Sequence, residues 1–99
     1  MRRGSTPTNT FDVDLDLRDA TVFISYEQDG AVVVEKTNAD LDIGETQIAL
    51  TLTQEETLLF HPGKVFIQIR YVFPNGAADA SEIIQTTFER IIKDGVIEP

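Results

Sequence analysis

The sequence lacks several residue types on which catalytic and cofactor sites depend. It contains no cysteine, so it can form no disulfide, iron–sulfur centre or thiolate nucleophile. Its one histidine, His61, stands before Pro62-Gly63 and would need carboxylates or a second chain to complete a metal site. No glycine-rich phosphate loop occurs, and neither Ser25 nor Ser81 lies in a nucleophile motif. We therefore expect no enzymatic activity and no cofactor or metal.

Positive charge is also scarce. Eight lysines and arginines stand against seventeen acidic residues, which gives a net charge of −9. Because phosphate contacts require cations, this balance argues against a nucleic-acid partner. No apolar run approaches the roughly eighteen residues of a membrane span, and Arg2-Arg3 is not followed by a signal core. We expect no membrane contact, and a protein used in the cytoplasm or released from it by lysis or inside a larger assembly.

The 99 residues suit one domain preceded by a short arm. Residues 1–8 combine Arg2 and Arg3 with small and turn-forming residues, and we expect them to form a flexible basic arm. Such an arm could reach an acidic surface of a neighbour, or it could be a disordered tail. Residues 9–99 are expected to form a single β-sandwich domain.

An acidic strand is predicted at the start of this domain. Apolar residues at positions 11, 13, 15 and 17 alternate with Asp12, Asp14 and Asp16, as in a half-buried strand. A calcium loop would need glycine and glutamate where Leu17 and Phe23 stand, so we reject that interpretation. A row of carboxylates on the solvent face is better explained as protection against edge-to-edge pairing.

The next segments read as short strands joined by turns. Strands are expected over residues 20–28, 32–36 and 46–52, with a hairpin turn at Asp29-Gly30. The continuous valines of residues 32–34 suggest a central strand that is buried on both faces.

The most elaborate local signal covers residues 53–73. Thr53 and Glu56 form a capping box, which predicts a short helical turn near residues 54–60, with Leu58, Leu59 and Phe60 closing one end of the core. From residue 64 the period changes to two, with apolar residues at 65, 67, 69, 71 and 73 on one face. Phe66, Gln68 and Arg70 share the other, mixed face.

The last part of the chain is less regular. Pro74-Asn75-Gly76 predicts a tight turn, after which residues 78–88 should return antiparallel to the long strand. Residues 88–93 could form a helical turn, which we prefer, or could continue as strand. Val96-Ile97 is expected to pack on the core, although it could reach a partner instead.

Short strands spaced eight to twelve residues apart, with one brief helical turn, predict an all-β fold. We expect an immunoglobulin-like antiparallel β-sandwich of about seven strands, with a partly open barrel as the alternative.

Four segments in this order resemble short phage and prophage proteins, encoded among the tail and structural genes of phages of Gram-positive, mostly clostridial bacteria. The segments are Met1–Thr8, Ala20–Gln28 with Val34–Lys36, Leu52–Thr57 followed by Gly63–Val65 and Gln68–Arg70, and Lys93–Ile97. The chain also looks similar, more weakly, to the N-terminal β-sandwich domains that attach baseplate proteins to phage tails. The resemblance implies a setting in the bacterial cytoplasm during assembly or in the virion, and it brings no catalytic residues.

The first functional hypothesis is therefore a non-enzymatic virion or virion-assembly protein of the tail, baseplate or connector. It would act through contacts with other virion or prophage structural proteins, or as a homo-oligomer. The expected interface residues are Arg2, Arg3, Asp12, Asp14, Asp16, Phe66, Gln68 and Arg70, with the two arginines docking on the aspartates of another copy.

Two alternatives belong to other classes. A carbohydrate-recognising β-sandwich would require an exposed aromatic among Tyr26, Phe66 and Tyr71, with polar neighbours. A small hydrolase or metal-dependent enzyme would require carboxylates within about 3 Å of His61, or a serine at hydrogen-bond distance.

Overall fold

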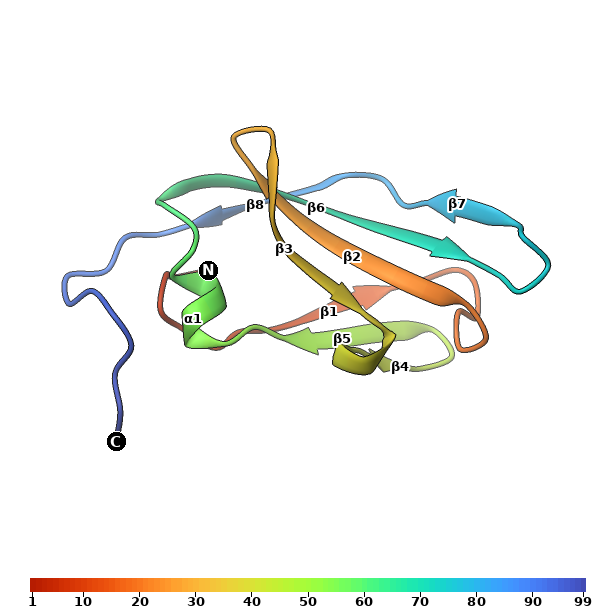
Figure 1. Cartoon of the computed structure of the whole chain (residues 1–99), viewed down its shortest axis with the longest axis horizontal. Helices are drawn as coiled ribbons and strands as arrows, with labels where there is room; N and C mark the ends of the chain where they lie inside the picture. The colour runs from red at the N-terminus through yellow and green to blue at the C-terminus, as the bar shows by residue number, and fades with distance from the viewer.

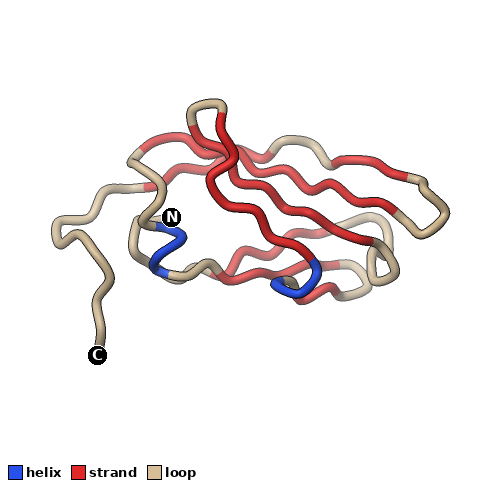
Figure 2. Tube along the Cα trace, viewed as in Figure 1, coloured by secondary structure: helices blue, strands red, loops and turns tan.

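The strands of the chain form two antiparallel sheets (Figure 1). The computed structural model describes residues 1–99. The three-stranded sheet has the order β1 (Thr8–Asp12), β5 (Gln47–Thr51), β4 (Asp42–Ile43). The five-stranded sheet has the order β3 (Ala31–Thr37), β2 (Thr21–Gln28), β6 (Gly63–Val72), and both β7 (Ala78–Ala80) and β8 (Ile84–Phe88) pair with β6. Two short helices, η1 (Asn38–Asp40) and α1 (Gln54–Thr57), interrupt the strands (Figure 2).

This strand order is immunoglobulin-like. Immunoglobulin domains place strands A, B, E and D in one sheet and C, F and G in the other, with C′ added beside C in variable-type domains. The order β1-β5-β4 matches B-E-D, and β3-β2-β6 with β7 and β8 matches C′-C-F-G. With β7 and β8 counted as one broken strand, seven strand positions are filled, as predicted. No strand occupies position A, so β1 has a free outer edge, and no pairing closes the sheets into a barrel.

The alternation of β2 and β6 builds the core. Val22, Ile24 and Tyr26 of β2 have no exposed surface, and Val65, Ile67 and Ile69 of β6 are at most 3% exposed. These side chains belong to one apolar cluster with residues of the three-stranded sheet, among them Phe11, Ile48 and Leu50. The predicted inward face of the long strand is confirmed.

An aromatic cluster closes one end of this core. The rings of Phe60 and Phe88 stack with centroids 4.5 Å apart, and Tyr26 meets Phe60 edge-on at 6.3 Å. The Tyr26 hydroxyl accepts a hydrogen bond of 2.7 Å from the Asn9 side chain. Of the three residues expected to close this end, Phe60 alone is buried, because Leu59 points outward and is 63% exposed.

The helical turn before β6 has the predicted capping box. The Glu56 N–H donates to the Thr53 hydroxyl at 3.1 Å, and the Thr53 N–H donates to the Glu56 carboxylate at 2.9 Å. Burial tends to raise the pKa of Glu56, but hydrogen bonds from Lys36 and Thr53 hold the pKa below its usual value. The Lys36–Glu56 ion pair also ties β3 to α1.

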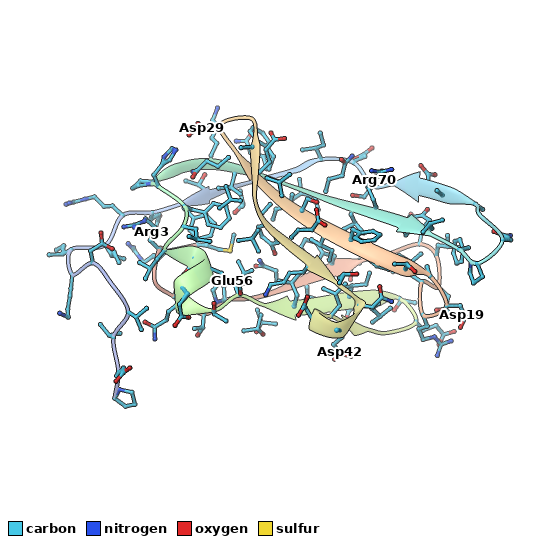
Figure 3. All side chains as sticks on the ribbon, in the orientation of Figure 1. Arg3, Asp19, Asp29, Asp42, Glu56 and Arg70 are labelled. Atoms are coloured by element: carbon cyan, nitrogen blue, oxygen red, sulfur yellow. The ribbon has the colours of Figure 1, made fainter.

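The N-terminal residues lie against the sandwich, which differs from the separate basic arm expected for residues 1–8. The Met1 ammonium donates to the Thr87 carbonyl at 2.7 Å, and Arg2 pairs with Glu89 as a parallel bridge. The Arg3 guanidinium donates to the carbonyls of Phe60 at 2.6 Å and Leu58 at 3.2 Å (Figure 3). Carbonyls at the end of a helix lack intrahelical donors, and a guanidinium supplies five N–H groups.

Two predicted strands differ in extent or place. The acidic strand ends at Asp12, because Asp16 instead accepts hydrogen bonds from the Arg18 backbone and side chain in the following turn. The strand of continuous valines is not central but forms the edge of the five-stranded sheet, and Val32 is 57% exposed.

The C-terminal third also differs from the prediction. The strand expected over residues 78–88 is broken at Ser81, because the Ser81 hydroxyl accepts the Ile69 N–H in place of a backbone carbonyl. Residues 89–99 form neither a helical turn nor a strand. Val96 and Ile97 are 46% and 56% exposed rather than packed in the core.

Replacing Arg3 should destabilise the fold. We expect Arg3→Ala to lower the free energy of unfolding by about 1.5–3 kcal/mol, because charged donors to two carbonyls are lost. Arg3→Lys should restore little, since an ammonium cannot reproduce the forked geometry. Arg2→Ala is the control, because its ion pair with Glu89 is exposed. Equal urea midpoints for Arg3→Ala and Arg2→Ala would contradict this prediction.

The buried phenol predicts alkaline sensitivity. Burial raises the pKa of Tyr26 to about 12, although the hydrogen bond from Asn9 opposes this effect. Unfolded tyrosine ionises near pH 10, so between about pH 10 and 12 the folded state keeps a proton that the unfolded state loses. Stability is therefore full below about pH 10 and falls by up to about 2–3 kcal/mol as the pH rises to about 12. In urea unfolding, the free energy of unfolding of Tyr26→Phe should decrease less between about pH 10 and 12 than that of the unchanged protein. An equal decrease in both proteins would show that Tyr26 does not cause it.

Candidate interaction face

The outward face of the five-stranded sheet brings together three residues predicted for an interface. Phe66, Gln68 and Arg70 alternate along β6 and point away from the core. Antiparallel pairing places Glu27 beside Phe66 and Ser25 beside Gln68 on the neighbouring strand β2. The predicted sharing of one face by these three β6 residues is therefore correct.

Four apolar side chains make this face unusual for a solvent-facing sheet. We call Phe23, Val32, Phe66 and Ile83 the outer-face patch. Phe23, Val32 and Ile83 are 37%, 57% and 64% exposed, and Phe66 is half-buried. A shallow hollow of about 380 Å³ lies over the sheet here, and Val32, Phe66 and Ile83 contribute to its lining.

The exposure of two patch residues follows from irregularities in the sheet. Val32 lies on the edge strand β3, next to a bulge where the register with β2 shifts after Tyr26. Ile83 lies in the break between β7 and β8. Sequence reasoning missed Phe23, Val32 and Ile83 as surface residues. The one available signal was the apolar run of residues 32–34, which also fits a buried strand.

Polar groups around the patch are partly engaged within the chain. The Ser25 hydroxyl donates to the Glu35 carboxylate at 3.3 Å, and the Gln68 amide donates to the Ser81 carbonyl at 3.0 Å. Arg70 is exposed beside β7 and makes no ion pair within the chain (Figure 3). An apolar centre with a polar and charged rim has the composition of a protein-contact surface.

The other predicted interface residues lie elsewhere. Arg2 and Arg3 are held at the α1 end by Glu89 and by backbone carbonyls. Asp12 and Asp14 are exposed beside the free edge of β1. The Asp16 carboxylate pairs with Arg18, whose hydrogen bond lowers the pKa of Asp16.

The arm-docking hypothesis for Arg2 and Arg3 stays a prediction. Both arginines already have intramolecular partners, because the N-terminal backbone pairs with Glu89 and brings the two side chains onto the chain's own end.

The single histidine, His61, follows Phe60, whose carbonyl accepts a hydrogen bond from Arg3, and so lies near the same end of the molecule. His61 Nε2 pairs with the Asp29 carboxylate at the tip of the β2–β3 hairpin, and Nδ1 contacts the Pro62 carbonyl at 3.0 Å. The hydrogen bond with Asp29 and then the one with Pro62 raise the pKa of His61. No group of three or more metal-ligating His, Cys, Asp or Glu side chains occurs. Nor is any helix of the chain long and apolar enough to span a membrane.

No protein-family model and no curated protein matches the chain. Among solved structures, the V domain of amphioxus IgVJ-C2 is similar over 92% of this chain and 97% of that chain, with 12% sequence identity and a TM-score of 0.38. The immunoglobulin-like fold rests on the strand order of the two sheets rather than on this likeness.

The outer-face patch should contribute little to folding. We expect Ile83→Ala to change the free energy of unfolding by less than about 0.5 kcal/mol, since the side chain is largely exposed. The same substitution at Ile69, which is 3% exposed, should cost about 2–5 kcal/mol. Urea denaturation of both variants tests this contrast, and a loss above about 1 kcal/mol at Ile83 would assign it a role in the core.

Proposed function

We propose that this chain is a non-enzymatic module that acts through protein–protein contacts. The setting that its sequence resemblance implies is a phage or prophage particle or its assembly, with other virion proteins as partners. The outer-face patch is the observation that carries the proposal, because Phe23, Val32 and Ile83 expose apolar surface on one side of the sheet and are not part of the buried core.

The charges of the face define the chemistry of the partner. Glu27 and Glu35 lie on the same face, on β2 and β3, while Lys64 and Arg70 extend from β6. A partner surface that fits would offer apolar side chains to Val32 and Ile83, with a basic group opposite the glutamates. Such complementarity steers association and fixes the orientation of the partners.

The carbohydrate-recognising alternative has less support. Tyr26 is fully buried in the core cluster, and Tyr71 packs partly against it. Phe66 is half-buried, and the hydroxyl of its neighbour Ser25 and the amide nitrogen of Gln68 already have partners within the chain. A sugar platform needs a flat aromatic face with free polar groups beside it, whereas the patch is formed mainly by aliphatic and half-covered side chains.

Site-specific photocrosslinking in cells that carry the prophage tests the proposal. A photoreactive amino acid is placed at Val32 or at Ile83, and at Leu59 as the control. Leu59 is 63% exposed, like Ile83, but lies on the turn after α1. After induction, we expect adducts with a virion structural protein from positions 32 and 83, identified by mass spectrometry, and few from position 59.

Equal adduct yields from all three positions, or none from positions 32 and 83, would contradict an interface at the outer-face patch. Mass spectrometry of purified particles then separates two forms of the proposal. A virion component is present in the finished particle, whereas an assembly factor is absent from it but crosslinks during assembly.

A further inference from the structure

The absence of strand A leaves a seam between the two sheets. On one side of this seam β1 pairs with β5 alone, and on the other side lie β7 and β8 at the margin of the five-stranded sheet. Between them is a groove of about 640 Å³. Its lining includes Phe11, Val13, Leu15, Tyr71 and Ile84.

The chain closes only part of the seam itself. Met1, Arg2 and Arg3 run parallel to Thr87–Glu89 through three backbone contacts, as a short first strand would. The groove lies further along, beside residues 10–17 and 80–84, where β1 and β7 approach the far end of the molecule (Figure 1).

The groove has the properties of a site for an added strand. The outer edge of β1 presents backbone N–H and C=O groups that no backbone partner in the chain uses. An added strand takes its affinity from such main-chain bonds and its specificity from pockets for alternate side chains. Leu15 and Ile84 are 46% and 40% exposed along the groove, so an inserted apolar side chain would bury them further.

Charge restricts what can occupy the groove. Asp12, Asp14 and Glu82 contribute to its lining, and none of them makes an ion pair within the chain. Two β1 edges would bring these carboxylates together, which disfavours symmetric pairing of β1 with β1. The occupant should therefore be an extended segment that carries both cations and an apolar side chain.

The C-terminal segment of a second copy meets this description. Residues 90–94 form no helix or strand, and Ile92 is 93% exposed. Arg90 and Lys93 flank the isoleucines and make no ion pair within the chain. Five extended residues span about 16 Å, the length of the five-residue β1. The segment follows β8 at the α1 end of the sandwich (Figure 1), where Asp94 pairs with Arg3. Beyond it, the Ile97 backbone exchanges two hydrogen bonds with the Gln54 side chain of α1.

We propose that residues 90–94 of one copy add as a strand to the β1 edge of the next copy, with Ile92 in the groove and Arg90 and Lys93 facing its carboxylates. Donor and acceptor are different surfaces, so the contact is head-to-tail and can extend into a ring or filament. The contact uses no side chain of the outer-face patch and does not involve the partner proposed for that patch. An experiment can therefore reject this proposal without rejecting the proposed function.

Light scattering of the full chain at low salt is the first test. We expect assemblies that grow with protein concentration up to about 1 mM and dissociate in about 0.5 M salt, because the contacts between charges are screened. Ile92→Asp should weaken association at least about tenfold, while Leu59→Asp, the same change at another exposed apolar residue, should leave it unchanged. Circular dichroism checks that each variant is folded.

Complementation then identifies the two surfaces. Ile92→Asp disables the C-terminal segment that is added as a strand but keeps the β1 groove. The double variant Asp14→Lys with Glu82→Lys disables the groove but keeps the C-terminal segment. Each should be monomeric alone, and their mixture should form a 1:1 complex that grows no further. A wild-type chain that stays monomeric would overturn the proposal, as would Ile92→Asp that assembles like wild type or a mixture that forms no complex.

Discussion

The burial of one face of β6 is the constraint on which the rest of the structure depends. Val65, Ile67 and Ile69 are inside the core, and both edges of the strand are paired, with β2 on one side and β7 and β8 on the other. A slip of one residue would turn the apolar set to solvent and place Gln68 and Arg70 in the core. The same constraint fixes Phe66, Gln68 and Arg70 on the outside, so the core determines which residues the outer face can offer.

Local signals were enough to predict the elements that this constraint uses. The period of two over residues 64–73, the Thr53–Glu56 capping box and the positive φ of Asp29 and Gly30 each depend on neighbours in the sequence. Their structures followed the prediction because no distant contact competes with them. The mixed face of β6 was found by the same alternation.

The features that sequence reasoning missed depend on distant contacts. Residues 32–34 would be central only if another strand paired with the outer edge of β3. No strand of the chain does so, and β3 therefore lies at the edge of its sheet. Arg3 reads as part of a tail until the carbonyls of Leu58 and Phe60, more than fifty residues away, are brought to it. Ile83 reads as part of a strand until Ser81 interrupts the pairing.

The distribution of cations links the two proposed contact surfaces. Copies of a chain with net charge −9 repel one another, so self-association requires positive charge concentrated at the contact. Four of the eight basic residues are held in intramolecular ion pairs. The other four are Lys64, Arg70, Arg90 and Lys93, and all lie on the outer face of β6 or in the C-terminal segment. The positive charge that the fold leaves unpaired is thus placed on two surfaces that also expose apolar side chains.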